Sequence, residues 1–416
     1  MRGSVVILSR TMAPSPENAG LNDAERFVAE HCRRSFFSLW TYPNPQGQSG
    51  KELCDLLTVC DPDVIIISVK HIDFKDTGRP EVDLTRWRRR AVDESVKQVF
   101  GAERCLNLDG EQHRVITKDG TTGLTIPAKG TRRMHRVAVA LGGDRKVLFS
   151  SGVVEGRDKY VHVLDGPSFV TILRELDTIS DFVAYLTAKE KLQAQVMMEG
   201  EEDLLAVYLQ NGRTFPDKDL ICLDGDVWHT FSQSDAYKAK KDADEVSYVW
   251  DRLIETFCRD QHAGLLLGGP DIDGVAQALR TMAREDRFTR RGLGKSFSGF
   301  LDANHQGQAR ARIHPDPGLA TYVFLGCPVA LPREDRIAEL KARCLIARWL
   351  HPEKAEVVGI ATETPKPGQG LSLDLMSLLI PELTPEQAAL AEQWRQEFGY
   401  FKNMRDCRRH EAEYPN

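Results

Sequence analysis

The feature that most constrains the fold is residues 50–71, which read GKELCDLLTVCDPDVIIISVKH. Residues 53–60 and 64–70 are rich in apolar and β-branched side chains, and the Asp-Pro-Asp sequence between them favours a turn. The pattern predicts two antiparallel strands. Both faces of this hairpin are apolar, so it should lie in the middle of a sheet that is covered on both sides.

The position of the turn predicts which side chains meet. If the chain reverses at residues 60–63, Asp55 pairs with Ser68. Side chains alternate along a strand, and Lys70 therefore lies on the same face as Ser68 and Asp55. A carboxylate, a hydroxyl and an ammonium group should converge at the open end of the hairpin. The alternative is an ordinary strand end, with Lys70 reaching water and Asp55 solvated.

This arrangement of an acid, a turn and a Ser-Val-Lys triplet resembles the active-site hairpin of the restriction-endonuclease-like, or PD-(D/E)xK, nucleases, particularly the nuclease-related-domain branch. The family places an acid two residues before its lysine, where this chain has Ser68. The resemblance covers residues 22–192. It implies an α/β fold with a mixed sheet flanked by helices, and a Mg²⁺- or Mn²⁺-dependent endonuclease that hydrolyses phosphodiester bonds of DNA, with RNA as an alternative substrate.

The resemblance also implies roles for individual residues. Asp55 would hold the metal ion, Lys70 would contact the attacking water or the scissile phosphate, and Ser68 would contact a ligand water or the phosphate. Because a serine cannot replace a carboxylate, a second acid is needed to hold a hard cation. The candidates for this second acid are Glu94, Glu52 and Glu25, followed by Glu81 and Glu30.

Two amphipathic helices are predicted beside the hairpin. One starts at Asn22, a good N-cap residue, and carries two of the candidate acids. The other covers residues 84–106, with Asp83 as its expected cap. It contains Gln98, and family members carry a glutamine on this helix near the metal or the DNA backbone. The plain alternative is that Gln98 and these acids face solvent.

Arginines cluster at the start of the second helix, around Trp87. Guanidinium groups bind phosphates through paired hydrogen bonds, so this cluster is the predicted nucleic-acid-binding surface. Its members are Arg86, Arg88, Arg89 and Arg90. Salt bridges to the acids at positions 83, 93 and 94 are the structural alternative.

Three domains are predicted along the chain. Residues 1–20 form a flexible leader, residues 21–196 the nuclease domain, and residues 197–416 a C-terminal α/β or α+β domain that senses a trigger or docks a partner. This last part contains a strand-helix-strand pattern at residues 320–362. Its basic residues at 280–295 would follow a nucleic-acid backbone or bind an acidic partner, and the structural alternative is a solvated helix face. The Gly294-Lys295-Ser296 triplet lacks the preceding glycine and strand of a phosphate loop, so nucleotide binding is not expected there.

Composition limits which binding surfaces, cysteine sites and cellular locations are possible. The chain has 416 residues and a net charge of −6, so any nucleic-acid surface must be local. Its nine scattered cysteines form no zinc or disulfide pattern, and no apolar run is long enough for a membrane span. We therefore expect a cytoplasmic protein that is not bound to a membrane.

The resemblance to these nucleases also suggests a prokaryotic anti-phage or restriction effector. Its activity would be regulated by its C-terminal domain, by a protein partner or by homo-oligomerisation. The alternative is a catalytically inactive nuclease-fold scaffold, or a nucleic-acid-binding subunit of a defence complex.

Overall fold

The computed structural model describes residues 21–47, 50–108, 113–143, 146–147, 150–262, 272–315, 318–364, 372–404 and 411–415. The chain forms two compact units, of which the first ends at Lys238 and the second continues from Ala239. The leader predicted at residues 1–20 lies outside the described residues. Within the described ranges, no helix is both long and apolar enough to cross a membrane.

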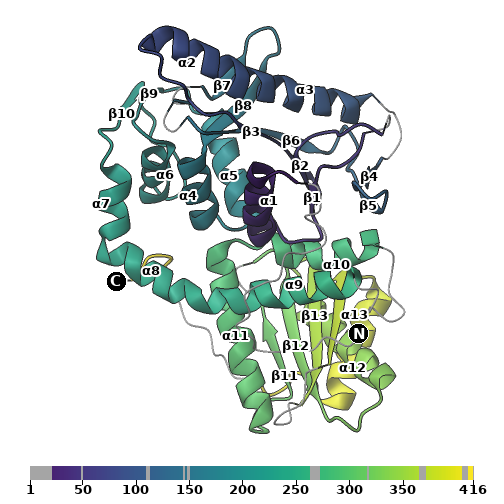
Figure 1. The fold of residues 1–416 in the computed structure, drawn as a ribbon. Coiled ribbons are helices and arrows are strands. Elements are labelled where there is room, and N and C mark those ends of the chain that lie inside the picture. Colours follow the sequence, from purple (N-terminus) through teal and green to yellow (C-terminus); the bar gives the residue numbers. More distant parts are fainter. Residues whose placement is uncertain are drawn as a thin grey trace. The chain divides into compact units, whose positions relative to one another are not determined.

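The first unit is built on a six-stranded mixed sheet (Figure 1). Its strands are β1 (Thr41–Pro43), β2 (Leu56–Cys60), β3 (Asp63–His71), β6 (Arg133–Leu141), β7 (Gly152–Val154) and β8 (Lys159–Asp165). They lie in the order β1-β2-β3-β6-β8-β7. The pairs β1-β2, β2-β3 and β7-β8 are antiparallel, whereas β3-β6 and β6-β8 are parallel. Two short pairs lie outside this sheet: β4 (Arg114–Ile116) with β5 (Thr122–Thr125), and β9 (Gln195–Met197) with β10 (Leu220–Cys222).

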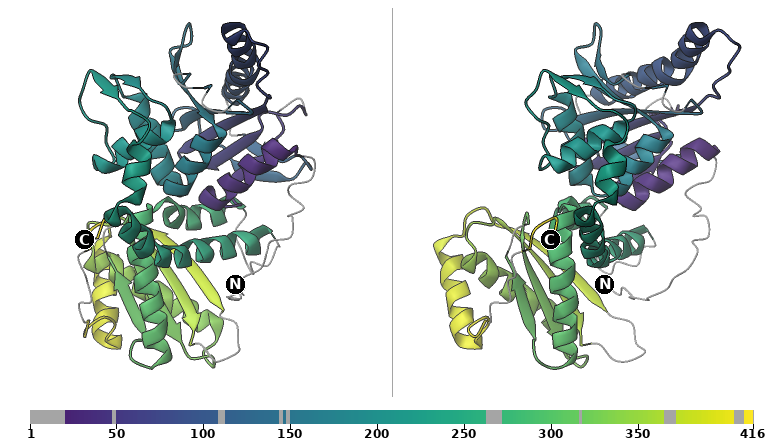
Figure 2. Two further views of the ribbon diagram at one scale, coloured as in Figure 1. Left: turned by 60° about the vertical axis from the view of Figure 1, so that its left-hand side comes forward. Right: turned by 90° about the vertical axis from the view of Figure 1, so that its left-hand side faces the viewer.

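Helices cover both faces of this sheet. The helices of this unit are α1 (Asp23–Phe36), α2 (Pro80–Arg88), the π-helical turn η2 (Arg89–Asp93), α3 (Glu94–Asn107), α4 (Gly166–Glu175), α5 (Ile179–Glu190), α6 (Glu201–Gln210) and α7 (Val227–Gln233). On one face α3 and η2 pack on β3 and β6, and α1 and α4 pack on the other face (Figure 2). The predicted α/β class, with a mixed sheet flanked by helices, is confirmed.

The central strand β3 is buried on both sides, as its apolar sequence predicts. All of residues 63–69 are buried. In the parallel register Ser68 pairs with Ala138 and Lys70 with Ala140, and these alanines belong to an apolar cluster shared with α2 and α3. Because paired residues in a sheet point to the same face, Ser68 and Lys70 face α3.

The first unit extends beyond residue 196, where the sequence pattern placed a domain boundary. The reason is that α6 packs on α5. Lys189 Nζ lies 2.5 Å from Glu201 Oε1, with both side chains buried, and the rings of Tyr185 and Tyr208 meet edge to face at 5.2 Å. The acidic run at the start of α6 is therefore partly buried inside the unit and does not mark a linker.

The second unit has its own four-stranded sheet. Its strands are β11 (Ala311–His314), β12 (Thr321–Cys327), β13 (Glu356–Glu363) and β14 (Leu373–Leu379), in that order. Its helices are η3 (Glu245–Ser247), α9 (Tyr248–His262), α10 (Ile272–Arg284), α11 (Arg287–His305), α12 (Arg333–Leu350) and α13 (Pro385–Phe398), and α8 (Asp235–Asp244) joins the units. The parallel pair β12-β13 is connected through α12, which confirms the predicted strand-helix-strand pattern.

Strand β12 shows why this second sheet is covered on both faces. Tyr322 and Phe324 point to one side, where their rings contact Trp250 of α9 at 5.1 and 6.3 Å. Val323 and Leu325 point to the other side and join the apolar cluster under α12. The alternation has the period of two that is expected for a strand.

Candidate functional site

The hairpin of β2 and β3 has the register predicted from the sequence. Leu56 pairs with Ile67 and Leu57 with Ile66, and the chain reverses at residues 61–62. The first strand is shorter than predicted, because its ladder begins at Leu56. Asp55 is therefore the residue just before β2, beside the end of the paired region.

Asp55 is the most firmly held side chain at this open end, and it is only 4% exposed. Its Oδ2 accepts a hydrogen bond from the Val69 backbone N–H at 2.5 Å, and its Oδ1 accepts one from Gln98 Nε2 at 3.1 Å. Lys70 Nζ lies 3.9 Å from the same Oδ2. Asp55 and Lys70 thus lie on one side of the sheet, as the predicted register required.

Ser68 reaches Asp55 through Gln98. The Ser68 side chain is fully buried, and its Oγ donates to Gln98 Oε1 at 2.9 Å. Gln98 is half-buried on α3, so its amide bridges the strand hydroxyl and the carboxylate. Since an amide has a fixed donor side and a fixed acceptor side, the Ser68 hydroxyl orients the Gln98 NH₂ group toward Asp55.

Glu52 supplies the second carboxyl group beside Asp55. Although Glu52 is exposed at the mouth of the site, partial burial of its carboxyl group raises its pKa from 4.5 to about 7. A hydrogen bond with Asp55 and the negative charges of Asp55 and Glu25 contribute to this raised pKa, and the charge of Lys70 opposes it. The Glu52 carboxyl group therefore keeps its proton up to about neutral pH.

Glu25 lies close enough for its charge to act on Glu52, but its own hydrogen bonds serve the helix. It is the third residue of α1 and completes a capping box with Asn22, as the sequence pattern for the N-terminus indicated. Its Oε2 also accepts from Asn44 Nδ2 at 3.2 Å. Asn44 was not among the predicted residues, and its place between two prolines of the connecting loop is the only sequence signal for it.

The other candidate acids are further removed from Asp55. Glu94 is exposed at the start of α3, one turn before Gln98, and makes no hydrogen bond or ion pair with a described residue. Glu81 is exposed in the first turn of α2, and Glu30 is exposed on α1. Within the part of the chain that is described, no three His, Cys, Asp or Glu side chains are arranged to hold a metal ion.

The donor set at the open end nevertheless suits a hard cation. Mg²⁺ is commonly held by one or two carboxylates together with waters and substrate phosphates. Asp55 and Glu52 provide such a pair of carboxyl groups. A divalent cation would also offset the negative charges of Asp55 and Glu25, which add to the effect of burial in raising the pKa of Glu52.

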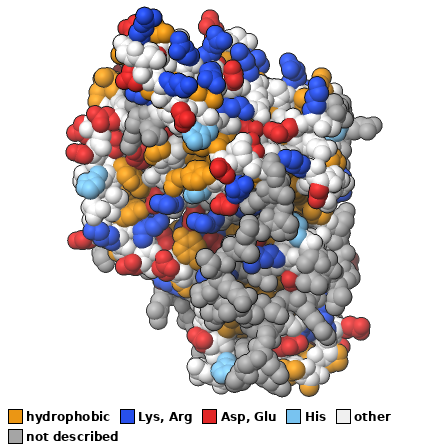
Figure 3. Space-filling model, in the orientation of Figure 1, with side chains coloured by type: hydrophobic (Ala, Val, Ile, Leu, Met, Phe, Trp, Pro, Cys, Tyr) orange, Lys and Arg blue, Asp and Glu red, His pale blue; other side chains and the backbone are white. Residues whose placement is uncertain are grey.

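The predicted arginine cluster divides into two groups. Arg86, Arg89 and Arg90 are exposed and make no hydrogen bond or ion pair with a described residue. Arg88 instead donates to Ser150 Oγ at 2.8 Å. The space-filling view shows Lys and Arg side chains gathered over the region of α2 (Figure 3).

Asp83 does not cap the helix as predicted. The helix begins three residues earlier, at Pro80, and the Asp83 carboxylate accepts hydrogen bonds from the backbone N–H and the hydroxyl of Thr77. It stabilises the loop that leads into α2. The π-helical turn in this helix was also not predicted.

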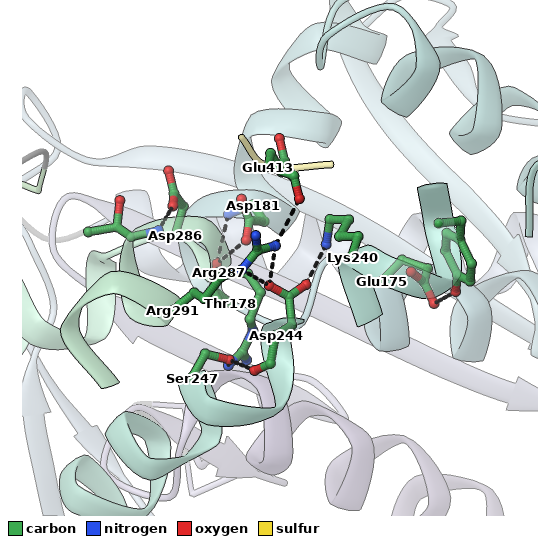
Figure 4. A network of polar contacts seen from close by, with 12 residues as sticks. Glu175, Thr178, Asp181, Lys240, Asp244, Ser247, Asp286, Arg287, Arg291 and Glu413 are labelled. Carbon is green, nitrogen blue, oxygen red and sulfur yellow. Dashed lines mark hydrogen bonds and ion pairs between the residues drawn. The ribbon is translucent and has the colours of Figure 1, made fainter. Parts of the chain in front are cut away.

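Three basic residues on α11 in the second unit form neither a nucleic-acid surface nor a solvated face, because their side chains are buried. Arg287 and Arg290 are buried and bind Asp251 at 2.8 and 2.7 Å. Arg291 is buried and binds Asp244, which also binds Lys240 (Figure 4). This interpretation of residues 280–295 was wrong for these three arginines, because their acidic partners come from other helices.

The remaining contacts of Arg291 reach the last described residues. It donates to the backbone carbonyl oxygens of Ala412 and Glu413 at 3.2 and 2.9 Å. Gly294-Lys295-Ser296 lies inside α11, which agrees with the rejection of a phosphate loop there.

Comparison with known proteins identifies no relative. No family model matches the chain, and neither curated proteins nor solved structures show significant similarity to it.

Proposed function

We propose that the first unit is a metal-dependent endonuclease that hydrolyses phosphodiester bonds of DNA. The observation that supports this most strongly is the meeting of two carboxyl groups and one ammonium group at the open end of a single hairpin. These groups belong to Asp55, Glu52 and Lys70. Their chemistry suits a hard cation and a phosphate better than it suits a purely structural ion pair, because two acids face one lysine.

In this mechanism Asp55 and Glu52 would hold Mg²⁺ or Mn²⁺, which when bound acts as a Lewis acid and makes water a better nucleophile. Lys70 is partly exposed, so its ammonium group can stabilise negative charge that builds on the phosphate oxygens. A water oxygen bonds to phosphorus while the bond from phosphorus to the leaving oxygen breaks, and the leaving oxygen takes up a proton. Val69 N–H and Gln98 keep the Asp55 carboxylate in one orientation.

The test is cleavage by the purified full-length protein. Duplex DNA, single-stranded DNA and RNA would each be incubated with Mg²⁺, with Mn²⁺ and with a chelator. Asp55→Asn and Lys70→Ala should each lower the cleavage rate on the order of 100-fold or more. Asp217→Asn and Lys129→Ala change exposed residues of the same charge and should cleave at the wild-type rate.

The competing proposal is a nucleic-acid-binding or scaffolding protein without catalysis. Ser68 stands where the resembling nucleases have an acid, which favours this alternative. Binding without cleavage under every metal condition would support it and exclude the nuclease. Cleavage that persists in both site variants would point to a contaminating enzyme. The role as an anti-phage or restriction effector, and regulation through the second unit, stay predictions that build on this activity.

A further inference from the structure

The helix above the proposed site is a continuous rod of α2, η2 and α3. One side of it is buried against the sheet, including Trp87, Ala91 and Val99. Near its middle, Gln98 donates to Asp55 and so marks where the proposed site touches the rod. Any ligand held along the rod therefore has a fixed direction relative to Asp55.

Residues 86, 90, 94 and 98 recur every four positions along this rod, and such residues lie on one side of a helix. Arg86 and Arg90 thus follow the same flank as Gln98, and Arg89 lies beside them. All three arginines are exposed, and no described residue forms an ion pair with them. A surface hollow of about 550 Å³ runs along α2, and its described lining includes all three.

Several other arginines of the first unit are instead paired with acidic side chains of the fold. Arg136 makes two hydrogen bonds to Glu103, both at 2.7 Å, and Arg133 pairs with Asp63. Such pairs neutralise the arginine charge within the fold. The three arginines of α2 and η2 keep their positive charge for a ligand, and phosphate groups match their donors best.

We propose that the row of Arg86, Arg89 and Arg90 binds the backbone of duplex DNA about four to five nucleotides to one side of the bond that is cut. This inference rests on the proposed function for the place of the cut, beside Asp55. Arg90 and Arg86 precede Gln98 by eight and twelve residues. At 1.5 Å per residue they lie about 12 and 18 Å along the rod, and one DNA strand advances about 3.4 Å per nucleotide.

The chemistry of the rod favours a duplex over a single strand. Single-stranded nucleic acid is usually held by aromatic side chains on which its bases stack. Residues 79–107 are all described, and their only aromatic residues, Trp87 and Phe100, are buried at 3% and 5% exposure. Contacts made by arginine alone follow the phosphates and do not read bases, so binding should be independent of sequence.

Glu94 interrupts the row between Arg90 and Gln98. Its exposed carboxylate would repel a phosphate at that position. The phosphate contacts should therefore be concentrated at the arginines, with a gap before the site. Because the arginines lie apart from the proposed cleavage site, they should contribute to binding even when no cleavage takes place.

The experiment measures binding without a divalent cation, so that catalysis does not enter. A labelled 20-base-pair duplex is titrated with full-length protein in chelator across a series of salt concentrations. In the triple variant R86A/R89A/R90A, affinity at low salt should fall about tenfold or more. The slope of log affinity against log salt should become shallower by up to about 2.7, at 0.9 for each lost phosphate contact.

Arg34→Ala is the control, because it removes the charge of an exposed arginine on α1, which packs on the other face of the sheet. Its slope should equal that of the wild type, and thermal unfolding would verify that every variant is folded. An unchanged slope in the triple variant overturns the inference. The inference is also overturned if single-stranded DNA or RNA binds as tightly as the duplex and loses as much affinity in the triple variant.

The outcomes separate this inference from the proposed function. A protein that binds duplex DNA through the three arginines but never cleaves it would refute the nuclease and keep the binding surface. A protein that cleaves DNA with an unchanged salt slope in the triple variant would keep the nuclease and refute the binding surface.

Discussion

Replacing Gln98 by alanine is the sharpest structural test of the proposed site, because Gln98 alone links Ser68 to Asp55. The change removes a donor from the Asp55 carboxylate, which is 4% exposed, and an acceptor from the fully buried Ser68 hydroxyl. A hydrogen bond to a charged group contributes about 1.5–3 kcal/mol, and a buried polar group without a partner costs about 1–3 kcal/mol. Since water can enter beside the half-buried helix position, we expect a loss of about 2–4 kcal/mol.

Ser68→Ala should cost less, about 1 kcal/mol, because water can reach the Gln98 oxygen that it leaves behind. Lys97→Ala is the control, as an exposed neighbour on the same helix, and should change stability by less than about 0.5 kcal/mol. Urea unfolding of the three single variants and of the Ser68–Gln98 double variant would give the coupling between the two residues.

We expect a Ser68–Gln98 coupling of about 1 kcal/mol. Gln98→Ala removes a hydrogen-bond donor from the Asp55 carboxylate, whereas Ser68→Ala leaves that donor in place. Gln98→Ala should therefore lower any cleavage rate more than Ser68→Ala does. The reasoning is refuted if Gln98→Ala is as stable as Lys97→Ala, or if the two changes at positions 68 and 98 are simply additive.

Two further predictions concern the second unit. Burial raises the pKa of Glu285 from 4.5 to about 7 despite hydrogen bonds from Tyr322 and Leu319, so the folded state holds this proton more tightly than the unfolded chain does. The stability that results is complete below pH 4.5 and is lost as the pH rises to about 7, a change of about 3 kcal/mol. Glu285→Gln should remove this loss when denaturation curves at pH 5 and pH 8 are compared. An identical pH dependence in the variant and the wild type would contradict the prediction. Gly294→Ala should destabilise the second unit by roughly 2 kcal/mol, since the new Cβ would lie 2.3 Å from the Val246 carbonyl oxygen. Gly292→Ala should stabilise α11 by up to about 1 kcal/mol, because its new Cβ would have 3.9 Å of clearance. Thermal unfolding of both variants would measure these changes.

The hairpin could be predicted from sequence because its information is local. A two-residue turn and two apolar strands leave one register, and that register places Asp55 near Lys70. The capping box of α1 and the strand-helix-strand pattern of the second unit were predictable for the same reason. In each case the residues that specify the structure lie within a few positions of one another or repeat with a clear period.

What could not be predicted depends on partners that are distant in the sequence. Glu52 was one of several candidate acids, and the pairing of Glu52 with Gln46 that accompanies its approach to Asp55 leaves no sign in the sequence periodicity that would single it out. The burial of Arg287 and Arg290 depends on Asp251, which lies on another helix. A run of arginines gives the same pattern whether each one faces solvent or a buried carboxylate.

The hydrogen bonds from Arg291 to the carbonyl oxygens of residues 412 and 413 have a consequence for producing the protein. A shortened chain that ends before residue 412 would strip two acceptors from a guanidinium group that is 1% exposed. Each donor left without a partner costs about 1–3 kcal/mol, so trimming by a carboxypeptidase should lower the melting temperature of the second unit. Residues 412 and 413 should therefore be kept when the protein is produced.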